Sequence, residues 1–332
     1  MFKVALFGFG RIGQLHAKNI HKDKNFELSY VYEKSHKLAL KAKKNYNCQI
    51  SDNYNKIFND KKIDIIFIAS PTSTHINLIE KGIYKRKIIF CEKPIDLNIE
   101  KVKKTLKKIV KLKPKIQMGF NRRYDPGHND IKNMLDKKKI GKLEKIIITS
   151  RDPSAPPVSY LKSSGGIFRD MMIHDFDMCR YFLKNDEIKQ ISAFSSSFNN
   201  KYNKINDHEL ACVTMKSKNG VLCSITNSRH CSFGYDQRIE LFGSKGMLIS
   251  GNKRSIETEY FVNNQTSSKK RLFNFFIDRY KEAYELELKE LFLLAKKKKT
   301  PRSTFIDGYE ALKLANAAVK SLSTKRTVFL SK

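Results

Sequence analysis

A glycine-rich turn near the N-terminus constrains the fold of this chain more than any other feature. The apolar run Lys3 to Phe7 leads directly into Gly8-Phe9-Gly10-Arg11-Ile12-Gly13, where a helical segment begins. Glycines permit a tight turn and close backbone approach, and the free N–H groups of a helix N-terminus attract a pyrophosphate. Glu33 stands 20 residues after Gly13, at the end of the second apolar run, where an acid binds ribose hydroxyls. Together these features predict a dinucleotide-binding βαβ unit.

The acid also predicts which dinucleotide is bound. A carboxylate at Glu33 repels the additional phosphate of NADP, so the sequence favours NAD. The basic residues that follow, Lys34, His36 and Lys37, could accept a 2′-phosphate, so NADP stays open as an alternative.

Strands and helices alternate through the first third of the chain. The apolar runs are continuous, as in strands of a parallel sheet that is covered on both faces. The predicted strands are Lys3–Phe7, Phe26–Tyr32, Ile63–Ala69, Lys87–Cys91 and Lys115–Gly119. The predicted helices are Arg11–Ile20, Ser35–Tyr46, His75–Lys81 and Ile99–Leu112. This order predicts a doubly wound parallel sheet, the Rossmann arrangement of an α/β domain.

The pattern changes near Asn121, where strands begin to follow one another directly. The predicted strands there are Ile146–Ser150, Ile188–Ser197, Glu209–Met215, Gly220–Asn227, Gln237–Phe242 and Met247–Ser250. Predicted helices are Phe168–Phe182, Asp278–Lys298 and Gly308–Leu322. Strands that meander through short turns predict an α+β domain with a mostly antiparallel sheet. We therefore expect a nucleotide-binding domain over residues 1–120 and a domain for substrate binding and oligomerisation over residues 121–332.

The charge of the chain raises the question of a nucleic-acid partner. Its 65 basic and 33 acidic residues give a formal net charge of +32. The lysines are spread along the whole chain, with only short clusters such as Lys296 to Lys299. We interpret them as a solvated coat and expect no nucleic-acid partner; a salt-dependent affinity for DNA would indicate the alternative.

Sequence signals of a membrane or secreted protein are lacking. The longest apolar stretch, Ile63 to Ala69, is far too short to span a bilayer, and the first residues do not form a signal peptide. The six cysteines form no CxxC pair, which suits buried free thiols in a reducing compartment. The sequence predicts a soluble cytoplasmic protein without a membrane partner.

Two sets of residues are candidates for chemistry. Lys93 follows the buried strand KIIFC, and parallel sheets bind ligands beyond the carboxyl ends of their strands. Asp170 and His174 are four residues apart, so on a helix they would share one face, where a carboxylate can orient an imidazole that acts as a base. The alternatives are a lysine that meets solvent, a helix-terminal carboxylate and a core histidine.

A metal site is not expected, and several polar residues are candidates for substrate binding. The chain has no HExxH, and His174 and Asp175 are adjacent, so on a helix they point in different directions. The candidate substrate residues are one arginine of the pair Arg122 and Arg123, with Arg123 preferred, and also Asp152, Tyr160 and Tyr235.

Eight segments in order along almost the whole chain resemble the Gfo/Idh/MocA oxidoreductase family. They are GFGRIG, FCEKPID, GFNRRYDP, SRDPSAPP, SGGIFRDMMIHDFDM, NSR, GYDQRIELFGSKGM and FFIDRYKEAYELEL. The EKP and Asp-x-x-x-His motifs are specific for the family, and RDPxxPP and GYDQR point to its inositol 2-dehydrogenase branch.

The resemblance implies roles for individual residues. It implies that Lys93, Asp170 and His174 are the catalytic set, and that Lys93–Pro94 is a cis peptide. It also implies that Ser70, Pro71, Thr72 and His75 line the nicotinamide and ribose side of the cofactor. Glu92 and Lys93 are further candidate cofactor residues. Related C-terminal sheets often mediate dimers and tetramers, so a homo-oligomer is expected.

The activity that the resemblance implies is oxidation of a ring hydroxyl of myo-inositol, a polyol, to a ketone, with hydride transfer to NAD⁺ and a place in inositol breakdown. Two alternatives remain open at this stage. One is another sugar or polyol dehydrogenase of the same family, and the other is a catalytically silent regulator that senses NAD.

Overall fold

The computed structural model describes residues 1–263 and 265–331, which form two compact units. The first unit contains Met1–Tyr124 and Glu282–Leu312, and the second contains Asp125–Lys281 and the chain from Lys313 onward. The division into functional domains at residue 120 stays a prediction. The first compact unit also includes the segment Glu282–Leu312, which lies late in the chain.

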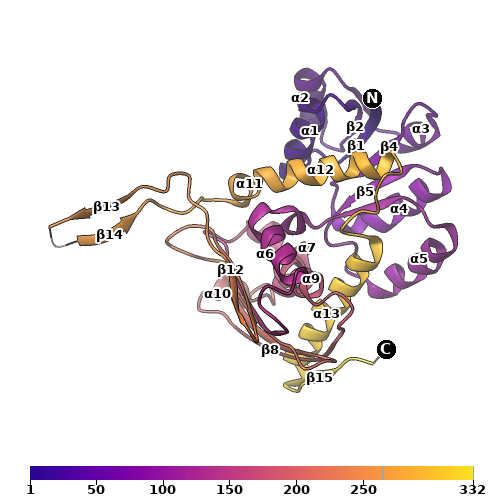
Figure 1. Cartoon of the computed structure of the whole chain (residues 1–332). Helices are drawn as coiled ribbons and strands as arrows, with labels where there is room; N and C mark the ends of the chain where they lie inside the picture. The colour runs from indigo at the N-terminus through magenta and orange to yellow at the C-terminus, as the bar shows by residue number, and fades with distance from the viewer. Residues whose placement is uncertain (264, 332) are drawn as a thin grey trace. The chain divides into compact units, whose positions relative to one another are not determined.

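The first unit is built on a parallel sheet (Figure 1). Among the described residues its six strands lie in the order β3-β2-β1-β4-β5-β6, and all neighbouring pairs are parallel. They are β1 (Phe2–Phe7), β2 (Phe26–Tyr32), β3 (Gln49–Ser51), β4 (Ile65–Ile68), β5 (Ile88–Glu92) and β6 (Ile116–Gly119). This order confirms the predicted Rossmann sheet and puts its topological switch point between β1 and β4.

Helices complete the first unit. They are α1 (Arg11–Lys22), α2 (His36–Tyr46), α3 (Tyr54–Asn59), α4 (His75–Tyr84), α5 (Ile99–Leu112) and α12 (Lys281–Ala295), with short 3₁₀ turns η1 (Thr72–Thr74) and η2 (Asn121–Tyr124). The returning helix α12 places Leu288, Leu291 and Leu294 in the same core as Val4 and Phe67 of the sheet. Burial of these apolar side chains is what holds the late segment to the nucleotide sheet.

The second unit contains a mixed sheet in the order β12-β11-β7-β10-β9-β8-β15. Its strands are β7 (Leu143–Arg151), β8 (Ile188–Ser196), β9 (Leu210–Ser217), β10 (Leu222–Ser228), β11 (Asp236–Gly243), β12 (Gly246–Ser250) and β15 (Val328–Phe329). Only β7 and β10 pair in parallel within this described sheet, and the other neighbours are antiparallel. The predicted mostly antiparallel α+β domain is confirmed.

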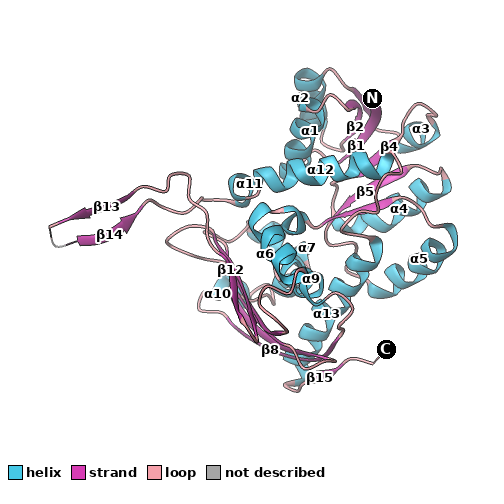
Figure 2. Cartoon of the chain, viewed as in Figure 1, coloured by secondary structure: helices cyan, strands magenta, loops and turns pink. Residues whose placement is uncertain are grey.

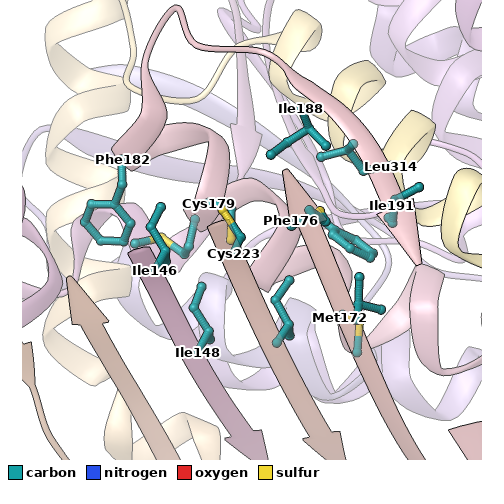
Figure 3. Close-up of a cluster of buried hydrophobic side chains, with 14 of the residues drawn as sticks. Ile146, Ile148, Met172, Phe176, Cys179, Phe182, Ile188, Ile191, Cys223 and Leu314 are labelled. Carbon is teal, nitrogen blue, oxygen red and sulfur yellow. The ribbon is translucent and has the colours of Figure 1, made fainter. Parts of the chain in front are cut away.

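One face of this sheet forms the core of the second unit (Figure 3). Side chains alternate between faces along a strand, so Ile146 and Ile148 of β7 point inward together. They pack in one cluster with Phe176 and Leu314. The helices of this unit are α6 (Pro126–Asp136), α7 (Val158–Ser164), α8 (Gly166–Asp170), α9 (Ile173–Leu183), α10 (Asn200–Asn203), α11 (Phe276–Arg279) and much of α13 (Phe305–Thr324).

The structure corrects the predicted helix over Phe168–Phe182. The chain instead forms α8 and α9, and the break lies at Met171 and Met172, whose N–H groups both donate to the carbonyl of Ile167. The apolar pattern is the same on both sides of the break, so periodicity could not locate it. The sequence also did not predict the hairpin of β13 (Glu259–Val262) and β14 (Gln265–Lys269), which extends away from the second sheet (Figure 2).

Within the described residues, every helix is too short or too polar to cross a lipid bilayer.

Candidate active site

The glycine turn after β1 is shaped by close contacts at two positions and open space at a third. Gly8 has φ +94°, and a Cβ there would lie 2.5 Å from the carbonyl oxygen of Ala69. A Cβ on Gly13 would overlap the carbonyl oxygen of Gly8, whereas a Cβ on Gly10 would meet no described atom within 4 Å. The turn is therefore tight where it packs on β4 and open at Gly10. This arrangement fits a pyrophosphate at the start of α1.

Glu33 lies at the end of β2 and holds the glycine turn. Its Oε2 accepts a hydrogen bond from the backbone N–H of Phe9 at 2.7 Å, and its Oε1 accepts one from Ser35 at 2.9 Å. A carboxylate has about four acceptor positions, so both oxygens keep capacity for ribose hydroxyls. The residues present at this turn fit the ribose and phosphates of a dinucleotide.

The segment after β4 carries the next group of predicted cofactor residues. Ser70, Pro71 and Thr72 lie at the carboxyl end of this central strand. The hydroxyls of Ser70 and Thr74 are hydrogen-bonded at 2.6 Å, and Thr74 donates to the carbonyl of Pro71 at 2.7 Å. These bonds give the segment a defined shape, and its contact with the cofactor stays a prediction.

His75, the first residue of α4, is buried, and both of its ring nitrogens face backbone carbonyls. Nδ1 lies 2.8 Å from the oxygen of Pro94, and Nε2 lies 2.8 Å from the oxygen of Ser70. Its predicted role as a cofactor residue stays a prediction, and the structure gives the ring nitrogens partners within the protein.

Lys93 begins the turn after β5, and the side chain of Glu92 supports it. The backbone N–H of Lys93 donates to Oε2 of Glu92 at 3.2 Å, while Oε1 of Glu92 pairs with Nε2 of His16 at 2.7 Å. The Lys93–Pro94 peptide is cis, as predicted. His16 was not predicted; the sequence signal for it is a histidine on the buried face of α1, between Gly13 and Ala17.

The arginines after β6 are both buried. The guanidinium of Arg123 pairs with Asp307 at 3.0 Å and also donates to the carbonyl of Arg302. These contacts lie inside the first unit. Whether Arg122 or Arg123 contacts substrate stays a prediction.

In the second unit the structure brings two of the predicted residues together. The hydroxyl of Tyr160 on α7 donates to Oδ1 of Asp170 at 2.8 Å. The other oxygen of Asp170 lies 3.6 Å from Arg229, which is fully buried and also pairs with Asp207 at 3.0 Å. Arg229 and Asp207 therefore contact both ends of α8, because Asp207 also accepts the N–H of Ile167 in its first turn at 2.9 Å. Neither was predicted, although Arg229 belongs to the NSR segment.

His174 lies in the first turn of α9, directly after the break in the helix. Its neighbour Asp175 points into the sheet, where it accepts hydrogen bonds from Ser150 at 2.7 Å and Asn227 at 2.9 Å. Asp175 is fully buried, whereas His174 is only partly buried.

The remaining two predicted substrate residues lie at strand ends of the second sheet. Asp152 follows β7, and its N–H donates to the carbonyl of Ser228 at 2.9 Å. Tyr235 precedes β11 and is buried, with its ring edge-on to Tyr280 at 6.1 Å between centroids. Across the residues that the structure describes, no cluster of three or more His, Cys, Asp or Glu side chains could hold a metal ion.

A Rossmann sheet with an open glycine turn, an acid at the end of β2 and polar residues at the carboxyl ends of β4 and β5 defines a dinucleotide-binding protein. Comparison with known families makes the assignment more specific. Residues 2–120 match the oxidoreductase family with an NAD-binding Rossmann fold, and residues 128–249 match the Gfo/Idh/MocA C-terminal domain. The chain therefore belongs to the Gfo/Idh/MocA oxidoreductase family, and its cofactor is NAD.

Individual relatives are similar over their whole length. The chain is 38% identical to an inositol 2-dehydrogenase of Rhizobium meliloti over 329 residues, which is 99% of each protein. The structure of a myo-inositol dehydrogenase from Corynebacterium glutamicum aligns with a TM-score of 0.95 and 40% identity, covering 100% of this chain and 99% of that one. A scyllo-inositol dehydrogenase from Lactobacillus casei, solved with NAD(H) and scyllo-inositol, aligns with a TM-score of 0.89 and 27% identity over 99% of both chains.

Proposed function

We propose that this enzyme oxidises one ring hydroxyl of myo-inositol to the ketone, 2-keto-myo-inositol. The observation that carries the proposal is the similarity to inositol 2-dehydrogenases from end to end, with Lys93, Asp170 and His174 all present. Bound NAD⁺ supplies the acceptor for the hydride that leaves the alcohol carbon. The residues that would hold it are the turn Gly8–Gly13 and Glu33.

His174 is the proposed general base. An alcohol carbon releases hydride readily only when its hydroxyl proton is also removed, and an imidazole suits this step near neutral pH. Asp170 is the proposed partner that orients the imidazole. The bond from Tyr160 and the nearby Arg229 support this role, because they fix the carboxylate of Asp170 itself.

Lys93 is the proposed electrostatic catalyst. Negative charge develops on the substrate oxygen as its proton leaves, and an ammonium group beside that oxygen stabilises the charge by about 3 kcal/mol in a site that excludes water. The bond between the Lys93 N–H and Glu92 supports a defined starting point for this side chain.

Recognition of the ring is assigned to Asp152, Tyr160, Tyr235 and one arginine of the pair Arg122 and Arg123. A polyol presents many hydroxyls, and a pocket of fixed donors and acceptors discriminates against a misplaced one because its buried polar groups would lose their partners. Relatives named for myo-inositol and for scyllo-inositol both resemble this chain, so the hydroxyl geometry is the feature to test.

A panel of substrates tests the proposal. NADH absorbance is followed with myo-inositol, scyllo-inositol, glucose, xylose and other polyols, each with NAD⁺ and NADP⁺. The proposal predicts the highest kcat/KM with myo-inositol and NAD⁺. If a sugar has the highest kcat/KM, the protein is a sugar dehydrogenase of the same family and the proposed substrate is wrong. If no alcohol is turned over, an NAD-sensing regulator is favoured.

Two further proposals concern the assembly and location of the enzyme. The outer face of the second sheet exposes Phe194, Leu222, Phe242, Met247 and Ile249, which supports self-association through this face into a dimer or tetramer.

All six cysteines are free thiols, which supports a reducing compartment such as the cytoplasm.

A further inference from the structure

His75 connects the two segments that follow the central strands β4 and β5. Its ring is 1% exposed and lies between the carbonyl oxygens of Ser70 and Pro94, each 2.8 Å from a ring nitrogen. Ser70 directly follows the β4 run, and Pro94 is the residue after Lys93. One buried side chain on α4 therefore contacts both segments.

The two contacts cannot both be hydrogen bonds when the ring is neutral. Neutral imidazole carries a single N–H, and a carbonyl oxygen can only accept. Burial lowers the pKa of His75 below its usual value of 6.5, although the two carbonyls and the carboxylates of Glu92 and Asp96 act in the opposite direction. At neutral pH the ring is therefore mostly uncharged, and one of its two nitrogens carries the proton.

The surroundings favour the proton on Nδ1. This nitrogen faces Pro94, and the same short segment carries the carboxylates of Glu92 and Asp96. An N–H hydrogen bears partial positive charge, so we expect the proton on Nδ1, the nitrogen that faces the segment carrying these acids.

We propose that His75 is a positioning residue for Lys93, whose Nδ1–H donates to the carbonyl of Pro94 and fixes the turn that carries the lysine. This inference rests on the proposed function, in which Lys93 acts on the substrate oxygen.

The turn is held at both ends by buried groups. On the N-terminal side, Glu92 accepts the N–H of Lys93, and His16 holds Glu92 in turn. On the C-terminal side, the bond from His75 holds the carbonyl of Pro94. Loss of that bond lets the C-terminal end move, and a displacement of about 1 Å in a reacting group costs roughly a hundredfold in rate.

Two substitutions separate this role from simple packing. Asparagine places its amide N–H group near the position of Nδ1, and glutamine places its amide N–H group near the position of Nε2. His75→Asn can therefore still donate to Pro94, whereas His75→Gln donates toward Ser70. The proposal predicts a kcat about tenfold or more higher for the asparagine variant than for the glutamine variant, with the KM for NAD⁺ similar in both.

Thermal unfolding of both variants shows whether each is folded before the rates are compared. Equal losses of kcat in two folded variants would overturn the proposal, because packing alone would then explain the effect. The same conclusion follows if the glutamine variant is the more active one.

NMR spectroscopy shows which ring nitrogen of His75 carries the proton, independently of turnover. In protein with ¹⁵N-labelled histidine rings, the His75 signals are assigned by their loss in His75→Asn. The proposal predicts a protonated Nδ1 and an unprotonated Nε2 at pH 7.5, and the reverse pattern would overturn it. Lys93→Met tests the proposed function separately from the His75 bond. Full turnover in this variant would contradict the catalytic role of Lys93, while the ¹⁵N signals of the His75 ring still show whether Nδ1 donates to Pro94.

Discussion

Glu33 has two tasks, and they can be separated. One, seen in the structure, is to accept the N–H of Phe9. The other, which is proposed, is to place negative charge beside the cofactor ribose. Glu33→Gln keeps an acceptor for Phe9 but removes the charge, so it should narrow the preference for NAD⁺ over NADP⁺ by about tenfold, since repulsion of the 2′-phosphate is lost. The ratio of kcat/KM for the two cofactors measures this effect.

Glu33→Ala is the companion variant, because it removes both the charge and the bond to Phe9. It should lower kcat/KM with both cofactors, and it should also reduce the ratio of kcat/KM for NAD⁺ to that for NADP⁺. Equal efficiency with NAD⁺ and NADP⁺ in the unsubstituted enzyme, or an unchanged ratio in Glu33→Gln, would show that the carboxylate does not set the preference.

Residues that belong to a local pattern could be predicted from the sequence, and residues that act through distant partners could not. Gly8, Gly13 and Glu33 occur at a characteristic spacing between apolar runs, and Lys93 directly follows one of them. His16 becomes significant only when β5 brings Glu92 to within 2.7 Å, and these residues are 76 apart in the chain. Arg229 likewise meets Asp170 only through the fold.

Helix α12 carries a buried carboxyl group that makes stability depend on pH. Neither carboxyl oxygen of Glu287 has a hydrogen-bond partner among the described residues, and Glu92 and Glu290 are nearby. Burial and these neighbours raise the pKa of Glu287 well above its usual 4.5. The folded protein thus keeps this proton at a pH where the unfolded chain releases it, so stability is lost as pH rises from 4.5 toward the raised value.

Glu287→Gln should remove this loss, because an amide has no proton to release in that range. We expect the variant to be more stable than the parent by about 1–3 kcal/mol at pH 8 and similar to it near pH 4.5. Urea unfolding at several pH values measures the difference. Glu285→Gln, an exposed site on the same helix, is the control. Parallel pH profiles for the parent and Glu287→Gln would contradict the prediction.

The elements show why apolar periodicity predicts some features and not others. The strands of the first sheet could be predicted from continuous apolar runs, because both faces of that sheet are buried. Those of the second could be predicted from strands that follow one another through short turns. The division of Phe168–Phe182 into α8 and α9 could not be predicted from the sequence. It depends on the N–H groups of Met171 and Met172, which both donate to the carbonyl of Ile167.

The chain as a whole should be an oligomer. Phe242 and Met247 are paired neighbours on β11 and β12, and both are about half exposed on the outer sheet face. Replacing both with glutamate should weaken self-association, because charge would be buried without a partner. Light scattering after size-exclusion chromatography measures the mass, and Val110→Glu, at an exposed site on α5, is the control.

A monomeric parent protein would contradict the proposed assembly. So would a double variant that keeps the mass of the parent at every concentration measured.

The order of the main strands and helices could also be predicted, although the hairpin of β13 and β14 could not, and neither could the compact units. The segment Glu282–Leu312 returns to the first unit because Leu288, Leu291 and Leu294 share its core. In sequence this segment contains most of one predicted helix, Asp278–Lys298, and the start of the next, Gly308–Leu322. No local signal shows which of two cores it joins.

The most direct test of the proposed reaction is the rate of NADH formation from myo-inositol and NAD⁺ in the parent enzyme, Lys93→Met and His174→Ala, with NADH binding measured on the same samples. The parent should turn over, and both variants should lose kcat by about 10²-fold or more while still binding NADH, since each lacks a group that is proposed to act on the reacting hydroxyl. Near-parental turnover in both variants would contradict the assignment of these residues to the chemistry.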